Sequence, residues 1–175
     1  AYNQPVFFVG DFHLHSKYSR ATSKNLGLDT LADGARIKGL NILSTGDFTH
    51  TIWFTELKNK LQPVNNTGIF TFDNIYFILT TEVATIFEFH GKIRHIHHNI
   101  HAKDFDVVEQ INEQLKKYGD LKSDGRPILN ISAPELVELL MGIDKNNLIY
   151  PNHAWTPWRS VFGAFGGFDS LEECY

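Results

Sequence analysis

The chain has 175 residues and a hydrophobic content of 42%, which suits one globular domain, and its formal net charge of −4 argues against a broadly basic nucleic-acid surface. A single cysteine, Cys174, excludes an internal disulfide, and because the first residues carry no secretory-signal pattern we expect a cytoplasmic protein. No apolar run approaches the roughly 20 residues that a membrane-spanning helix needs, so no membrane role is expected.

The first half of the chain predicts two units in which a strand precedes a helix. Residues 6–9 form an apolar run that we expect to be a strand, and after a polar loop a helix is expected over 29–38. A second strand over 41–48 leads into a short helix over 53–61.

The second half predicts a long strand that turns and returns, followed by helices and one more strand. Ile and His or Arg alternate in the returning segment, which places the histidine cluster on a strand rather than a helix. Ser132 and Glu135 form a capping box that opens a helix. The remaining elements are expected at 75–87, 92–102, 104–118, 147–155 and 169–173.

Alternating strands and helices with right-handed crossovers predict an α/β fold with a parallel sheet or barrel. At most five strands are expected, whereas a closed barrel of this kind needs about seven or eight. We therefore expect residues 1–175 to be the N-terminal portion of a single barrel domain that stops short at Tyr175. The open strand edges would be covered by the C-terminal remainder of the same protein or by another chain.

Residues that bind divalent metals follow four apolar runs, and in parallel barrels the chemistry gathers at the carboxyl ends of strands. The period of two in a strand would place Asp11, His13 and His15 on one face. Such a set suits Zn²⁺ or Mn²⁺, and the alternative is a polar strand end with satisfied hydrogen bonds. The other three runs precede Asp47 and His50, Glu82, and His153.

The segment FHLHS resembles the opening motif of the PHP (polymerase and histidinol phosphatase) family of metal-dependent phosphoesterases. The resemblance spans the whole chain and implies a distorted (β/α)7 barrel that binds two or three divalent metals. The family's T-D-H motif appears as Gly46-Asp47-Phe48, with His50 as a possible substitute, and its last D-x-H motif has no counterpart before Tyr175. By this resemblance the metal ligands are His13, His15, the bridging Glu82, His97 and His153.

The resemblance favours His97 over the adjacent His98, because His97 lies five residues before Ala102 as in the family's H-x-x-x-x-A strand. In an extended segment one member of an adjacent pair faces the metal and the other points away. Three further histidines are not expected to share the direction of His97: His90, His95 and His101.

A narrower resemblance is to the endonuclease Q family, PHP-type DNA repair nucleases. Several of the matching segments have no metal role, yet they occur together and in order: GDFHLHSKYSRATSKN, STGDFTH, FILTTEV, LKSDGRPIL, HAWTPW and GFDSLEECY. This resemblance implies a nuclease that nicks DNA on the 5′ side of uracil, hypoxanthine, xanthine or an abasic site. The segment up to Tyr175 would be inactive alone.

Two groups of side chains are candidates for DNA contact. A basic loop follows the first metal pair and could bind phosphates, or be an ordinary solvated loop. Large side chains after His153 could stack on a base turned out of the duplex, or belong to the core. The first group is Lys17, Arg20 and Lys24, and the second is Trp155, Trp158 and Arg159.

The residues by themselves favour hydrolysis of a phosphate ester. Two metals about 3.5 to 4 Å apart and joined by Glu82 can activate water, with Asp47 as a second catalytic carboxylate. Histidine ligands favour Zn²⁺, with Mn²⁺ or Mg²⁺ as alternatives. Together with the resemblance to the endonuclease Q family, this chemistry leads us to expect an endonuclease for damaged DNA. The alternatives are a PHP phosphatase or exonuclease, and a metal-stabilised binding domain without catalysis.

Overall fold

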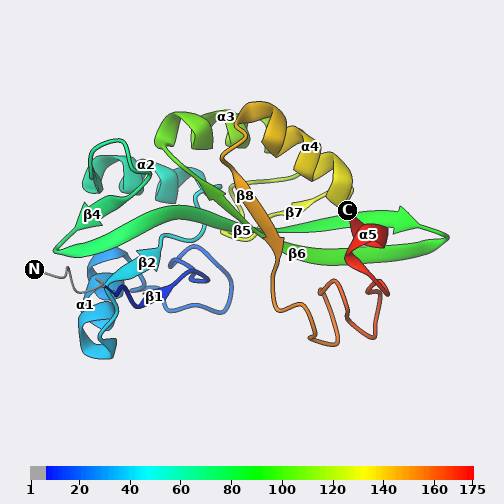
Figure 1. Ribbon diagram of the computed structural model, residues 1–175, viewed down its shortest axis with the longest axis horizontal. Coiled ribbons are helices and arrows are strands. Elements are labelled where there is room, and N and C mark those ends of the chain that lie inside the picture. The colour runs from blue at the N-terminus through cyan, green and yellow to red at the C-terminus, as the bar shows by residue number, and fades with distance from the viewer. Residues whose placement is uncertain (1–6) are drawn as a thin grey trace, which may run out of the picture.

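The computed structural model describes residues 7–175, which form a mixed α/β fold with an eight-stranded sheet (Figure 1). β1, β2 and β5 are parallel neighbours, whereas β6 returns antiparallel to β5 and β8 lies antiparallel to β6. The strands that could bring side chains to a common site therefore run in the same direction, apart from β6. Their bounds are β1 (Gly10–Asp11), β2 (Ile42–Ser44), β3 (Gln62–Pro63), β4 (Phe70–Phe72), β5 (Ile75–Phe89), β6 (Lys92–Ala102), β7 (Ile128–Leu129) and β8 (Leu148–Pro151).

Helices and loops are divided between the two sides of the long β5–β6 hairpin. In Figure 1, α3 and α4 lie along its upper side, whereas the loops that follow β1 and β8 lie along its lower side. Along the middle of the hairpin, the lower side therefore carries no long helix of residues 7–175. The candidate site forms there. The helices are α1 (Leu28–Lys38), α2 (Thr51–Lys60), α3 (Phe105–Leu115), α4 (Ala133–Ile143) and α5 (Leu171–Cys174).

Local sequence explains why the two covering helices begin where they do. The Asp104 carboxylate accepts the Val107 backbone N–H at 2.8 Å, which satisfies one free donor at the start of α3. At α4, the Ser132 hydroxyl accepts the Glu135 N–H, and the Glu135 carboxylate accepts the Ser132 N–H at 3.1 Å. Each helix then buries one apolar stripe against the sheet, and Val108 and Leu136 are fully buried.

The helices and the long strands lie close to their predicted bounds, and the predicted long strand that turns and returns is confirmed, but the sheet is mixed rather than parallel throughout. β5 and β6 form an antiparallel hairpin through a tight turn at His90 and Gly91, and both turn residues have positive φ. Within residues 7–175 the sheet has eight strands rather than at most five. The unpredicted strands β3, β4 and β7 have two or three residues each, too few to show a periodic pattern.

The predicted first strand is also displaced. Val6 lies outside the described residues, and Phe7, Phe8 and Val9 are exposed and precede β1. Within residues 7–175, β1 pairs with β2 alone, so it lies at an edge of the described sheet and is not a strand buried on both faces. Among the helices of residues 7–175, none is long and apolar enough to cross a bilayer.

The capping box of α4 provides a test of the fold. Ser132→Ala removes the hydroxyl that accepts the Glu135 N–H, so we expect the free energy of unfolding to fall by about 1 kcal/mol. Urea unfolding measures this value. Ser132→Thr keeps an acceptor at the same position and should retain most of the stability, and equal losses in the two variants would contradict the capping role.

Candidate metal centre

The Glu82 carboxylate is buried in the middle of β5 and contacts four histidines. Its Oε2 atom lies 2.5 Å from His13 Nε2 and 3.4 Å from His15 Nε2. Its Oε1 atom contacts His97 Nδ1 and lies 3.9 Å from His153 Nε2. One carboxylate is thus shared by two groups of three ligand atoms, and within each group these atoms lie within 4.8 Å of one another.

The register of the β5–β6 hairpin brings Glu82 and His97 together. Glu82 pairs with Asn99 and Ala84 pairs with His97, and residues opposed in an antiparallel pair point to the same face. The side chains of Glu82 and His97 therefore lie on one face as diagonal neighbours. His98 lies on the other face, where its ring contacts the hydroxyls of Thr85 at 2.9 Å and Tyr175 at 2.7 Å.

His13 and His15 lie in the loop after β1 and not on the strand itself. This corrects the predicted alternation, because Asp11 does not join them: its carboxylate accepts the His13 backbone N–H at 3.1 Å and belongs to neither ligand group. The loop is fixed to the end of β2 by the Leu14 N–H, which donates to the Ser44 hydroxyl at 3.1 Å. Loop geometry therefore directs both rings to Glu82.

Asp47 lies behind His15 and is completely buried. Its Oδ1 atom lies 3.0 Å from His15 Nδ1, while its Oδ2 atom accepts the Ser16 N–H at 2.6 Å and the hydroxyls of Ser16 and Ser19, both at 2.8 Å. A carboxylate in this position holds the proton on Nδ1 of His15 and directs Nε2 to Glu82. The structure thus places Asp47 one imidazole ring away from the cluster, as a positioning residue.

His50, a possible metal ligand in the sequence analysis, belongs to neither ligand group of the described chain. Its ring accepts the Trp53 N–H as the N-cap of α2 and stacks on Tyr18, with ring centroids 4.2 Å apart. Burial lowers the pKa of His50, so the ring is neutral near pH 7. Its position two residues beyond Phe48 makes it the N-cap of α2.

His153 follows β8 with a positive φ of 31°. Its Nε2 atom lies 3.3 Å from His97 Nδ1, and its Nδ1 atom lies 3.1 Å from the Thr156 hydroxyl. The neighbouring Asn152 amide lies 3.3 Å from His13 Nε2, so the ends of β1 and β8 meet at the site. The bond to Thr156 occupies one ring nitrogen of His153 and leaves the other directed at the cluster.

The prediction that His95 and His101 do not share the direction of His97 is wrong. All three occupy alternate positions of β6, so they lie on one face, and the rings of His95 and His97 are 5.5 Å apart. His101 lies further along and contacts the Tyr150 hydroxyl at 2.9 Å. Both remain outside the two ligand groups of the described chain.

The electrostatics of the cluster reflect competition between burial and hydrogen bonding. Burial opposes ionisation of Glu82, but its bonds with His13, His15 and His97 hold the pKa of this carboxylate far below its usual range. Burial also opposes protonation of His15, but hydrogen bonds with Asp47 and Glu82 outweigh it and raise the pKa of His15 to about 9. Without a metal, the site therefore holds an ionised glutamate beside a protonated histidine.

Some of the predicted DNA-contact residues form ion pairs within the protein, and others are exposed. Lys17 pairs with Glu56 at 2.9 Å, and Arg20 pairs with Asp124 at 3.1 Å, whereas Lys24 is exposed. The basic loop is therefore partly neutralised by its own neighbours.

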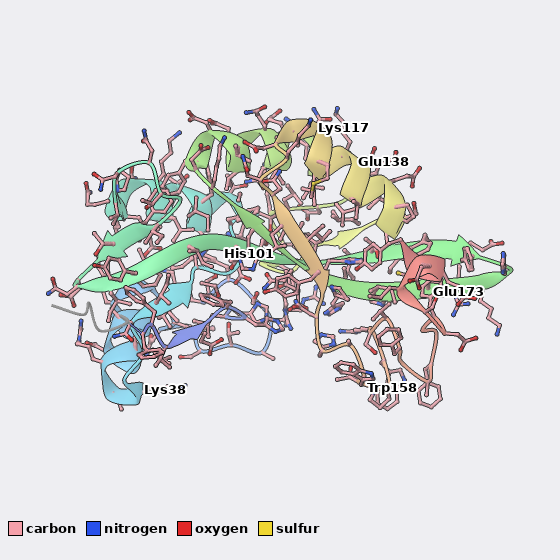
Figure 2. All side chains as sticks on the ribbon, viewed as in Figure 1. Lys38, His101, Lys117, Glu138, Trp158 and Glu173 are labelled. Carbon is pink, nitrogen blue, oxygen red and sulfur yellow. The ribbon has the colours of Figure 1, made fainter. Side chains whose placement is uncertain are left out.

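The aromatic residues after His153 are exposed, so the alternative that they belong to the core is wrong. Trp155 is 82% exposed and Trp158 is 62% exposed, and Trp158 stacks on Phe165 with ring centroids 5.1 Å apart. Figure 2 shows Trp158 on the loop below the β5–β6 hairpin. Trp158 and Arg159 also line a cleft of about 330 Å³ together with the ligand residues.

Two side chains at the site were not predicted. Arg126 and Thr156 line the same cleft as the histidines. Nothing in the local pattern of Ser123–Arg126 distinguishes an ordinary turn from a loop on the DNA side. Thr156 carries no signal apart from its spacing of three residues from His153.

Comparison with known proteins finds solved structures with a similar fold. The crystal structure of the lesion-specific endonuclease PfuEndoQ from Pyrococcus furiosus is 34% identical, with a TM-score of 0.82, over 96% of this chain and 39% of that chain. A structure of endonuclease Q in complex with a 27-mer duplex substrate, with an abasic lesion at its active site, is 35% identical with the same TM-score over 96% of this chain and 40% of that one. The predicted resemblance is therefore confirmed.

One curated relative also matches this chain, over a small part of its own length. The uncharacterized protein MJ0043 of Methanocaldococcus jannaschii is 34% identical over 148 residues, which are 84% of this chain and 16% of that protein. No family model matches the chain. The chain thus spans about a sixth of this curated relative and about two fifths of the solved structures.

The pKa values predict how metal-free protein responds to pH. The pKa of His15 is raised from 6.5 to about 9, so its stabilising contribution is complete below pH 6.5 and is lost as the pH rises through 9. The pKa of Glu82 is lowered from 4.5, so its contribution is present above pH 4.5 and is lost on acidification. We therefore expect the free energy of unfolding, measured by urea in chelator, to fall between pH 6.5 and 9. Asp47→Asn should flatten this decline, and an equal decline in both proteins would contradict the pairing.

Close packing behind His15 gives a second prediction. A Cβ atom on Gly125 would lie 2.5 Å from Asp47 Oδ2 and 2.6 Å from Ser19 Oγ, so Gly125→Ala should lower the free energy of unfolding by about 1–3 kcal/mol. Gly142→Ala is the matched control, because its Cβ meets nothing within 4 Å inside α4 and should stabilise by up to about 1 kcal/mol. If the two variants unfold at the same urea concentration, the packing around Asp47 is looser than described.

Proposed function

We propose that this chain carries the metal site of an endonuclease that nicks DNA on the 5′ side of deaminated bases or abasic sites. The observation that carries the proposal is the buried Glu82 carboxylate, shared by two histidines on each of its oxygens. The similarity to two endonuclease Q structures, at 34% and 35% identity, supports DNA as the substrate. Uracil, hypoxanthine and xanthine are the deaminated bases that we infer.

The donor set fits two divalent cations. We infer that His13 and His15 hold one and that His97 and His153 hold the other, with Glu82 bridging them. Imidazole nitrogens outnumber carboxylate oxygens, which favours Zn²⁺ over Mn²⁺ or Mg²⁺. When bound, two such ions lower the pKa of a bound water to near 7 and offset the charge of a phosphodiester. We infer two ions rather than three, because neither Asp47 nor His50 belongs to a ligand group.

The chain's own residues would prepare this site for hydrolysis. Asp47 holds the Nδ1 proton of His15, and Thr156 occupies Nδ1 of His153, so each ring presents its other nitrogen to the cluster. Glu82 stays ionised at neutral pH because three histidine contacts lower its pKa. The functional groups at the site are thus oriented before substrate arrives.

We infer that the loop after β8 contacts the lesion strand. Trp158 and Phe165 are exposed and stacked, and Trp158 borders the cleft of the metal ligands. An exposed indole beside a hydrolytic site can stack on a base that has left the duplex. Trp155, Lys24 and the outer face of Arg20 are further DNA contacts in this proposal, whereas Lys17 is engaged with Glu56.

We also propose that residues 1–175 are the N-terminal portion of a distorted (β/α)7 PHP-type barrel, completed by further sequence of the same protein or by another chain. The pairing pattern supports this, because β1 pairs with β2 and β8 pairs with β6, and the described chain leaves the other edge of each without a strand. Phe12 and Leu148 are exposed close to these edges. The segment alone is expected to be inactive, and the cytoplasmic location stays a prediction.

Glu82→Gln in the full-length protein tests the proposal. We expect the bound metal to be lost and the rate of nicking of a uracil-containing duplex to fall more than about 100-fold. Removing a residue that only hydrogen-bonds a metal ligand typically lowers activity by less than this. Metal analysis and a gel assay measure the two effects. His90→Asn is the matched control, because His90 lies at the tip of the β5–β6 hairpin with a positive φ that asparagine tolerates.

The same assays separate the alternatives. If the wild-type protein hydrolyses p-nitrophenyl phosphate and leaves uracil-containing and abasic duplexes intact, the site belongs to a phosphatase. If no phosphoester is cleaved but chelation unfolds the protein, the metal has a structural role.

A further inference from the structure

Among residues 7–175, Arg126 has no carboxylate partner, and it lines the cleft of the candidate metal ligands. It is half-buried in the loop between α3 and β7 and lines the cleft with the ligand histidines, and Arg159 lines the same cleft from the loop after β8. In the part of the chain that the structure describes, neither guanidinium lies within ion-pair distance of a carboxylate, whereas Arg20 and Arg36 both do. Two uncompensated cations therefore border the candidate metal centre.

The position of Arg126 is fixed by its own loop. Its backbone N–H donates to Asp124 Oδ1 at 3.1 Å, and its Nη2 donates to the Arg20 carbonyl oxygen at 2.7 Å. The other oxygen of Asp124 pairs with the Arg20 side chain at 3.1 Å. Asp124 thus neutralises Arg20 and orders the loop, while the charge of Arg126 remains available to a ligand.

The loop is also joined to the residues that orient His15. Gly125, which precedes Arg126, donates its N–H to the Tyr18 carbonyl oxygen at 3.0 Å and packs directly against the Asp47 carboxylate. The contacts that hold Asp47 behind His15 therefore also set the distance between the Arg126 backbone and the ligand cluster. A guanidinium held in this way needs little reorganisation when an anion enters the cleft.

We propose that Arg126 and Arg159 form an anion clamp that binds the substrate phosphate from two sides of the metal cleft. This inference rests on the proposed phosphoesterase function and adds Arg126 as a residue that touches the substrate. Guanidinium groups suit the role because their fixed fork of donors matches the oxygens of a phosphate and they stay charged at any working pH. A phosphate between the two arginines would supply the counter-charge that neither finds in the described chain.

The test uses full-length, metal-loaded protein and inorganic phosphate as the probe. We expect Arg126→Ala to weaken phosphate binding, measured by calorimetry, by about 10- to 100-fold, while the metal content and the melting temperature stay unchanged. Arg126→Lys keeps the charge without the fork and should recover part of the affinity. Arg36→Ala is the matched control, because Arg36 pairs with Asp33 and Asp73 at the other end of the molecule.

A double variant tests whether the two arginines act on one anion. If both contact the same phosphate, the loss in Arg126→Ala/Arg159→Ala should differ from the product of the two single losses. Independent, multiplicative losses would overturn the clamp, and so would phosphate binding by Arg126→Ala equal to that of Arg36→Ala. A loss of metal in Arg126→Ala would also overturn it, because the effect would then be structural.

Nicking assays keep this inference separate from the proposed function. Wild-type protein that nicks a uracil-containing or abasic duplex, with kcat/KM unchanged in Arg126→Ala, supports the nuclease and rejects the clamp. Wild-type protein that leaves every DNA substrate intact but binds phosphate through Arg126 rejects the nuclease and supports the clamp.

Discussion

The contact between one buried carboxylate and four imidazole rings organises the functional half of this structure. Glu82 is 3% exposed, and an ionised carboxylate at that depth is stable when it is surrounded by donors or cations. Its partners come from the loop after β1, from β6 and from the end of β8. The contacts that compensate the charge of Glu82 therefore bring together segments that are far apart in the chain.

A second layer of contacts keeps the rings in place. Asp47 is saturated by Ser16, Ser19 and His15, and it follows Gly46, whose φ of 61° suits glycine. A Cβ atom on Gly46 would lie 2.2 Å from the Leu14 carbonyl oxygen, so the end of β2 touches the loop that carries His13 and His15. The close backbone approach explains why glycine precedes Asp47, whose carboxylate lies behind His15.

One side of the β5–β6 hairpin packs into the core, and the other faces the cleft. On one side α3 and α4 bury apolar stripes. His98 lies on the face opposite Glu82, between Thr85 and Tyr175, and burial lowers its pKa to about 3, so it remains neutral. On the other side the same strands present Glu82 and His97 to an open cleft, with Trp158 beside it. One residue of register along β6 therefore separates a core histidine from a candidate metal ligand.

Sequence alone determined the local features of this protein, and tertiary structure decided which side chains meet. Strand-end patterns and family resemblance identified Glu82 and the histidines beside it, and caps such as Ser132 marked where helices begin, because these signals depend on neighbours within a few residues. The roles of Asp47, His50 and Arg126 did not follow from such signals. Asp47 meets Ser16 across 31 positions and Arg126 meets Arg20 across 106, so their partners exist only after the chain has folded.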